Sequence, residues 1–186
     1  MNILRILLVT SIFTLLLGCA GDEDALSKIK KDFTINGIFG IKLGVINKEL
    51  PEGYIIENKE ISFTPDKADD RFVQYQYSTT PKSHVIYGIK VKSHRELSKE
   101  NCLSQRDALI KSTLETLGDT PSIRIFEEKN KWKIREGNQR EITIDCEPAV
   151  SSNTLQLVMI CQDTALSLLA FKEWKKRQTE ITLIRF

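Results

Sequence analysis

Two stretches in the last third of the chain, REITIDCE (140–147) and LQLVMICQ (155–162), carry apolar residues at every second position. A proline and several small polar residues lie between them and favour a turn. Because successive side chains of a strand point to opposite faces of a sheet, this pattern predicts an antiparallel hairpin. Ile142, Ile144 and Cys146 would share one of its faces. We therefore expect the fold to be built on an antiparallel sheet.

Two tyrosine-bearing segments, 71–79 and 84–92, show the same two-residue period, with a hairpin connection between them. Their polar residues fall largely opposite the tyrosines, which implies a sheet with one covered face. The first segment places Phe72, Gln74 and Gln76 opposite Val73, Tyr75 and Tyr77. The second places Val85, Tyr87, Ile89 and Val91 opposite His84, Ile86 and Lys90. The remaining predicted strands are 37–44 (with glycines 37, 40 and 44 at turn or bulge positions), 60–64, 131–136 and 180–186.

A first helix is expected over residues 98–117, where leucine and isoleucine recur at helical spacing. Gly118 suits the position after the last helical residue, because glycine readily adopts a positive φ. Ser98 and Ser104 are both candidates to cap the start, and Ser104 with Asp107 has the form of a capping box.

A second helix is expected over 164–177, with Asp163 as its cap. The basic window KEWKKRQ (172–178) would be its solvated end, where cations complement the helix dipole. The inward stripe is predicted to comprise Leu166, Leu169, Ala170 and Trp174. The element order predicts an α+β fold, an antiparallel sheet with about two helices packed on it.

The N-terminus has the layout of a secretory signal peptide. Arg5 supplies a positive charge, a mostly aliphatic stretch follows over 6–17, and small residues flank Cys19. An apolar core of about 12 residues is short for a membrane-spanning helix, which takes about 20. We expect residues 1–18 to be cleaved, the alternative being a buried N-terminal helix of the folded domain.

Leu16, Gly18 and Cys19 resemble the lipobox of bacterial lipoproteins, in which an aliphatic and a small residue precede an obligatory cysteine. The resemblance implies that Cys19 carries a diacylglycerol thioether and, once it is the mature N-terminus, an amide-linked acyl chain such as palmitate. Several acyl chains give stable membrane anchoring. Ala20 stands where aspartate would retain an enteric lipoprotein in the inner membrane. The resemblance therefore implies the periplasmic face of the outer membrane.

Length and charge favour a single domain over 33–186, joined to the anchor by a polar tether over 19–32. The formal net charge is +2, and lysines and glutamates are interspersed rather than grouped. A nucleic-acid-binding protein would show a basic stripe, so this class of partner is not expected. The basic window 172–178 is more readily explained as an exposed helix surface than as a ligand patch.

Three cysteines remain once Cys19 is lipidated, and export to an oxidising compartment favours a disulfide among them. In the predicted hairpin, Cys146 would lie near Leu155 and Cys161 near Arg140, so these two thiols would be about 20 Å apart. A disulfide needs Cα atoms within about 7 Å. Cys102 therefore pairs with Cys146 or Cys161, and we predict Cys102–Cys146, with Cys161 as a small core residue.

Metal, cofactor and catalytic motifs are not expected in this chain. The cysteines lack the spacing of a zinc site, and no Gly-x-Ser-x-Gly accompanies the two histidines, His84 and His94. Both histidines are predicted at the surface. Asp66, Asp69 and Asp70 lack the glycine and glutamate of a calcium-binding loop, so they are predicted to form a solvated loop.

The sequence therefore predicts a non-catalytic binding or structural module of the cell envelope. Its partners would be membrane lipid, through acylated Cys19, and another envelope protein. One alternative is an inhibitor or immunity lipoprotein that neutralises a toxin or lytic enzyme in the periplasm. A second alternative is a cell-wall or lipid hydrolase whose catalytic residues are dispersed along the chain.

Overall fold

The structure, a computed structural model, describes residues 33–48, 60–94, 97–128, 131–149 and 153–184. The predicted signal peptide, the tether and the lipidation residue Cys19 lie outside the described residues.

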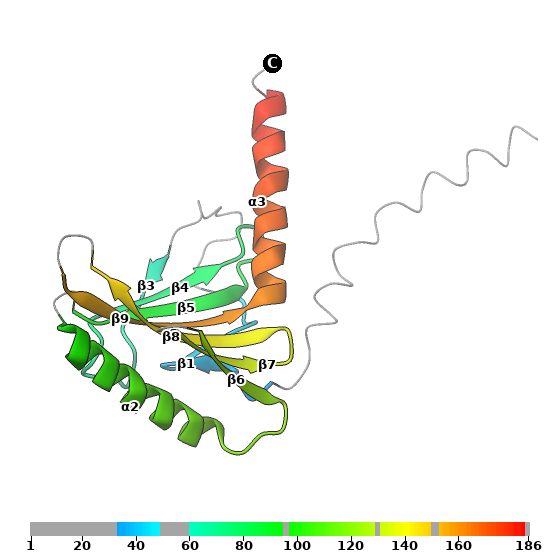
Figure 1. The fold of residues 1–186 in the computed structure, drawn as a ribbon. Coiled ribbons are helices and arrows are strands. Elements are labelled where there is room, and N and C mark those ends of the chain that lie inside the picture. Colours follow the sequence, from blue (N-terminus) through cyan, green and yellow to red (C-terminus); the bar gives the residue numbers. More distant parts are fainter. Residues whose placement is uncertain (1–32, 49–59, 95–96, 129–130, 150–152, 185–186) are drawn as a thin grey trace, which may run out of the picture. The chain divides into compact units, whose positions relative to one another are not determined.

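A seven-stranded antiparallel sheet forms the centre of the described domain (Figure 1). Its strand order is β3-β4-β5-β9-β8-β7-β6, and the predicted hairpin supplies the two nine-residue strands β8 and β9. Position in the middle of the sheet explains why these two strands carry the strongest apolar pattern. The strands are β3 (Ile61–Ser62), β4 (Gln74–Thr79), β5 (Ile86–Lys92), β6 (Ile123–Glu128), β7 (Lys131–Glu136), β8 (Arg140–Pro148) and β9 (Leu155–Asp163).

The predicted strand 37–44 is instead a tight hairpin of two short strands, β1 (Gly37–Ile38) and β2 (Ile41–Lys42). Its turn places Phe39 at φ 52° and Gly40 at φ 83°. A Cβ at Gly37 would lie 1.9 Å from the carbonyl oxygen of Ile41, so only glycine fits this position. The glycines do mark turn positions. The chain reverses direction within the segment, however, so the glycines do not stand at the two ends of a single strand.

Helix α2 (Lys99–Leu117) packs on one face of the sheet, against β8 and β9. The side chain of Ser98 accepts a hydrogen bond from the backbone N–H of Asn101 at 3.2 Å, which makes Ser98 the cap. The alternative cap Ser104 lies inside the helix. Gly118 ends the helix at φ 68°, as predicted, and its N–H donates to the carbonyl oxygen of Leu114.

Helix α3 (Thr164–Ile184) is longer than predicted and includes residues that were expected to form a strand over 180–186. Asp163 caps it as expected, because its carboxylate accepts the N–H of Leu166 at 2.9 Å. The sequence after the cap contains no glycine or proline, so the local chain has no signal to stop. The basic window 172–178 therefore lies within the helix and not at its end.

Only the first turns of α3 contact the sheet, whereas the rest projects from it (Figure 1). Leu166 and Ala170 are buried, as the predicted inward stripe requires. Trp174 belongs to that predicted stripe but is 37% exposed, because it lies past the edge of the sheet. Among the described residues, two helices and an antiparallel sheet confirm the expected α+β class.

Strand β6 has no counterpart among the predicted strands. It pairs with β7 at the edge of the sheet, from Ile123 opposite Glu136 to Glu128 opposite Lys131. All of its residues after Ile123 are exposed, including Ile125 and Phe126. A strand without a buried face shows no two-residue period, which is why the sequence does not reveal it.

The alternation predicted for the β4–β5 hairpin holds at Tyr75 and Tyr77 in β4 and at Ile89 and Val91 in β5, but it fails at two places. Tyr75 and Tyr77 are buried as expected, but Phe72 is buried and Val73 exposed because the chain enters the strand only at Gln74. In β5 the register shifts opposite Ser78 and Thr79, which breaks the alternation around Tyr87. This irregularity places Ile86 rather than Tyr87 among the buried residues.

The predicted disulfide is present. Cys102 at the start of α2 is bonded to Cys146 on β8, with Cα atoms 6.1 Å apart. The register of the hairpin is shifted by two residues from the prediction, so Cys146 lies opposite Leu157 and Cys161 opposite Ile142. Cys161 is then about 13 Å from Cys146 along the ladder, and it is a fully buried free thiol, as expected.

A candidate binding pocket between helix α2 and the β1–β2 hairpin

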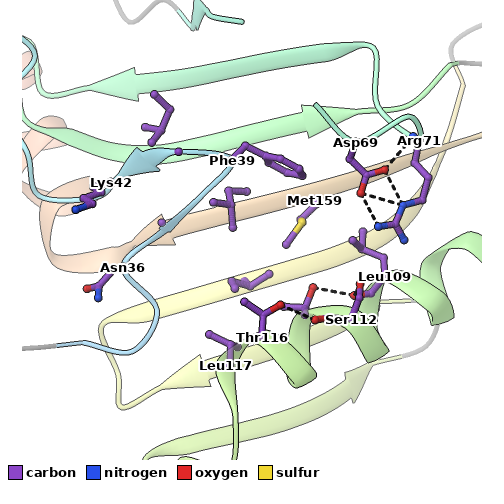
Figure 2. Close-up of a pocket in the computed structure, with 16 residues that line it drawn as sticks. Asn36, Phe39, Lys42, Asp69, Arg71, Leu109, Ser112, Thr116, Leu117 and Met159 are labelled. Atoms are coloured by element: carbon purple, nitrogen blue, oxygen red, sulfur yellow. Dashed lines mark hydrogen bonds and ion pairs between the residues drawn. The ribbon is translucent and has the colours of Figure 1, made fainter. Parts of the chain in front are cut away.

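A pocket of about 580 Å³ lies between helix α2, the β1–β2 hairpin and the sheet (Figure 2). This volume falls within the range of about 300–1,000 Å³ that is typical of ligand sites. The segment that precedes β4 closes one end with Asp69 and Arg71, whereas Asn36 and Lys42 lie at the other end.

The hairpin wall is held in place by aromatic packing. Figure 2 shows Phe39, at the hairpin turn, directed into the pocket. The centre of its ring lies 5.6 Å from the centre of the Phe72 ring and 5.3 Å from that of the Tyr75 ring, and both pairs are arranged edge to face. Such edge-to-face pairs contribute about 0.5–1.5 kcal/mol beyond burial. The tip of the hairpin is therefore attached to the sheet rather than free in solvent.

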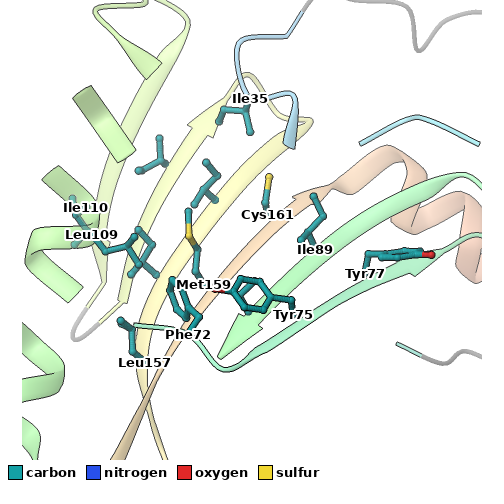
Figure 3. Close-up of a cluster of buried hydrophobic side chains, with 14 of the residues drawn as sticks. Ile35, Phe72, Tyr75, Tyr77, Ile89, Leu109, Ile110, Leu157, Met159 and Cys161 are labelled. Carbon is teal, nitrogen blue, oxygen red and sulfur yellow. The ribbon is translucent and has the colours of Figure 1, made fainter. Parts of the chain in front are cut away.

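The floor of the pocket is the hydrophobic core of the domain. Ile142 on β8 and Met159 on β9 reach it from neighbouring strands, and Leu109 approaches from α2. Figure 3 shows Met159 in the centre of the cluster, between the aromatic residues of β4 and the helix. Methionine is flexible and polarizable, so this floor can adapt to apolar groups of different shape.

The helix wall carries three hydroxyl groups that already have partners. Ser112 and Thr113 donate to the carbonyl oxygen of Leu109 at 3.0 and 2.8 Å, and Thr116 donates to that of Ser112 at 2.8 Å. Bonds of this kind to the preceding turn direct the hydroxyl hydrogens into the helix backbone. The wall therefore offers a ligand few free donors.

An ion pair closes one end of the pocket. The Arg71 guanidinium donates to Asp69 from Nε at 2.8 Å, and the Asp69 carboxylate also accepts the Arg71 backbone N–H at 2.9 Å. These hydrogen bonds lower the pKa of Asp69 and raise that of Arg71. The hydroxyl of Tyr75 donates to the carbonyl oxygen of Asp69 at 2.9 Å, which fixes this segment against β4.

A carboxylate on β7 fixes the segment that leads into the hairpin. Glu136 accepts the backbone N–H of Ile35 at 2.8 Å, that of Thr34 at 3.0 Å, and the hydroxyl of Ser122 at 3.2 Å. Burial alone would raise the pKa of Glu136, but the hydrogen bonds from Ile35, Thr34 and Ser122 together outweigh it and lower that pKa. No sequence pattern predicts this role, because a charged residue at a strand end ordinarily faces water.

A buried ion pair joins the same segment to the base of α3. Arg140 Nε lies 2.8 Å from Asp163 Oδ2, and both side chains are almost fully buried. The guanidinium also stacks over the ring of Phe33, 4.8 Å from its centre. Because Asp163 caps α3, this pair connects the N-terminal segment, the central hairpin and the helix.

Of the acidic residues that the sequence singled out, the structure places only Asp69 at the pocket, whereas Asp66 and Asp70 are exposed. Within the described ranges no group of histidine, cysteine, aspartate or glutamate residues is arranged to hold a metal ion. His94 is exposed, as predicted.

The predicted surface position of His84 is wrong. The residue is 8% exposed and adopts φ 52° in the turn between β4 and β5. Its backbone N–H donates to Thr80 at 3.1 Å, and its carbonyl oxygen accepts the N–H of Asn47 at 2.9 Å. Packing of the segment after β2 against this turn buries the histidine, a contact between distant parts of the chain that the local sequence does not encode.

The chemistry of the pocket favours binding of an apolar group. Its floor is aliphatic and sulfur-containing, its hydroxyls are bonded to the helix, and Asp69 is held in its ionised form by Arg71. A general base works best with a pKa near the operating pH, and the pKa of Asp69 is shifted away from it. These features suit recognition rather than proton transfer.

Comparisons with protein-family models, curated proteins and solved structures find no match for this chain. Neither α2 nor α3, over the residues described for them, combines the length and apolar character that a membrane-crossing helix requires.

Proposed function

We propose that this chain is a lipid-anchored protein of the cell envelope that acts as a non-catalytic binding module. The pocket between α2 and the β1–β2 hairpin carries the proposal, because it opens the apolar core to a ligand between two fixed walls. The occupant is an apolar group presented by another envelope protein. The Cys19 anchor, supported by the pattern Leu16–Cys19, would keep the domain at the membrane where that partner resides.

Site-specific photocrosslinking in intact cells tests the pocket. Benzoylphenylalanine at Thr116, an exposed residue that lines the pocket, should form an adduct with an envelope protein. The same probe at Glu115, exposed on α2 outside the pocket lining, should form none. Equal adducts from the two positions, or adducts with lipid alone, would contradict a protein partner at this site.

A filling substitution then links the adduct to the cavity itself. Ser112→Trp places a large ring at the pocket wall and should reduce the Thr116 adduct at least fivefold. Lys111→Trp makes the same change at a neighbouring exposed position that does not line the pocket, and should leave the yield unchanged. Equal losses in both variants would indicate a general effect on α2.

The anchor is tested separately by metabolic labelling with a palmitate analogue. The wild-type chain should incorporate the label and sediment with membranes, whereas Cys19→Ser should lose the label. A label that persists in Cys19→Ser, or is absent from the wild type, would refute lipidation at this residue without bearing on the pocket.

A further inference from the structure

Helix α3 carries an exposed apolar stripe that the fold leaves uncovered. Leu168, Phe171 and Trp174 are 63%, 55% and 37% exposed. Residues three apart are neighbours on a helix surface, so the three side chains form one continuous strip, here called the α3 stripe. Leu166 and Ala170 are buried against the sheet on the adjacent side of the helix, and Trp174, four residues after Ala170, lies at the border between the two sides.

Basic residues border the α3 stripe. Lys175 Nζ lies 5.6 Å from the centre of the Phe171 ring, a cation–π contact that places one charge directly beside the strip. The other cations of this part of the helix are Lys172, Lys176 and Arg177. The apolar strip and the positive charge thus share the projecting part of α3.

Glu173, the acidic residue within the basic window 172–178, is hydrogen-bonded to another part of the chain. Glu173 accepts the backbone N–H of Lys82 at 2.7 Å and the hydroxyl of Ser83 at 2.8 Å, both in the turn between β4 and β5. These bonds fix the helix to the sheet and direct the carboxylate away from the α3 stripe. They leave the exposed surface with an excess of positive charge.

We propose that the α3 stripe docks on an anionic phospholipid surface. Helices that lie in a membrane interface combine Leu, Phe and Trp on one side with lysines at the border, and those lysines meet lipid phosphates. Protein–protein interfaces are instead depleted of lysine, so the composition favours lipid over a protein partner. Docking would also orient the domain, because α3 is attached to the sheet through Glu173 and Asp163.

Quenching by brominated lipids tests this placement. The full chain is reconstituted with an excess of vesicles made of phosphatidylcholine alone or with phosphatidylglycerol, and tryptophan fluorescence is measured with and without brominated acyl chains. Quenching should be strong in anionic vesicles, and Trp174→Phe should remove at least half of it. Vesicle flotation measures separately whether the chain is attached to the vesicles. Loss of the Cys19 anchor is therefore not mistaken for loss of docking by the α3 stripe.

Matched variants separate the α3 stripe from general hydrophobicity. Leu168→Ser with Phe171→Ser should abolish quenching, whereas Ile125→Ser with Phe126→Ser, two exposed apolar residues on β6, should not change it. Lys172→Gln with Lys175→Gln should lower the docked population about fivefold per lysine, and Lys99→Gln with Lys111→Gln on α2 should not. Equal quenching in the two kinds of vesicle, or equal loss in a control pair, would overturn the proposal.

Discussion

The Glu136→Gln substitution tests whether one carboxylate attaches the N-terminal segment to the sheet. One carboxylate oxygen accepts the N–H of Thr34 and the hydroxyl of Ser122, and the other accepts the N–H of Ile35. A glutamine has a single oxygen, so its NH₂ group must face one of these donors. Hydrogen bonds to a charged group contribute about 1.5–3 kcal/mol each, so the free energy of unfolding should fall by about 2 kcal/mol at pH 7.

The effect of Glu136→Gln should depend on pH in a defined direction. Because the folded-state pKa of Glu136 is lowered, its contribution is present above the unfolded-state pKa and is lost as pH falls through the folded value. The difference between wild type and Glu136→Gln should therefore shrink below about pH 4.5. Denaturation in guanidinium at pH 7 and at successively lower pH measures this directly.

Two further measurements complete the Glu136 test. Hydrogen exchange at the Ile35 amide should accelerate in Glu136→Gln, because this N–H loses its acceptor or its charge assistance. Glu115→Gln removes the same charge at an exposed position on α2 and should change stability by less than about 0.5 kcal/mol. A Glu136→Gln effect below about 0.5 kcal/mol at pH 7, or one undiminished at low pH, would refute the reasoning.

Two other predictions concern the cysteines. Replacing both Cys102 and Cys146 with alanine should lower the free energy of unfolding by about 4 kcal/mol, since the disulfide closes a 44-residue separation; equilibrium unfolding that shows no loss would contradict this chain-entropy account. Burial raises the pKa of the Cys161 thiol to about 12, so Cys161 should resist iodoacetamide in the native protein and react only after denaturation; mass spectrometry of alkylated peptides locates the label, and rapid native labelling of Cys161 would show that β9 opens readily.

The sequence by itself determined the elements whose pattern of buried and exposed residues is regular along their whole length. Strands β8 and β9 lie in the middle of the sheet, so their alternation is strong and predicts both the hairpin and the exclusion of a Cys146–Cys161 bond. The caps Ser98, Gly118 and Asp163 act on backbone groups within a few residues, so they too are visible locally. The hairpin pattern and the predicted start of the first helix together led to Cys102 as the disulfide partner of Cys146.

Only the tertiary structure decided the features that depend on contacts between distant segments. Strand β6 forms because β7 offers it an edge, a pairing that the local sequence does not encode. The pocket likewise depends on Glu136, which holds residues 34 and 35 from about a hundred positions away. Hydrophobic period reports burial along one element, whereas hydrogen bonds and ion pairs between elements exist only after the chain has folded.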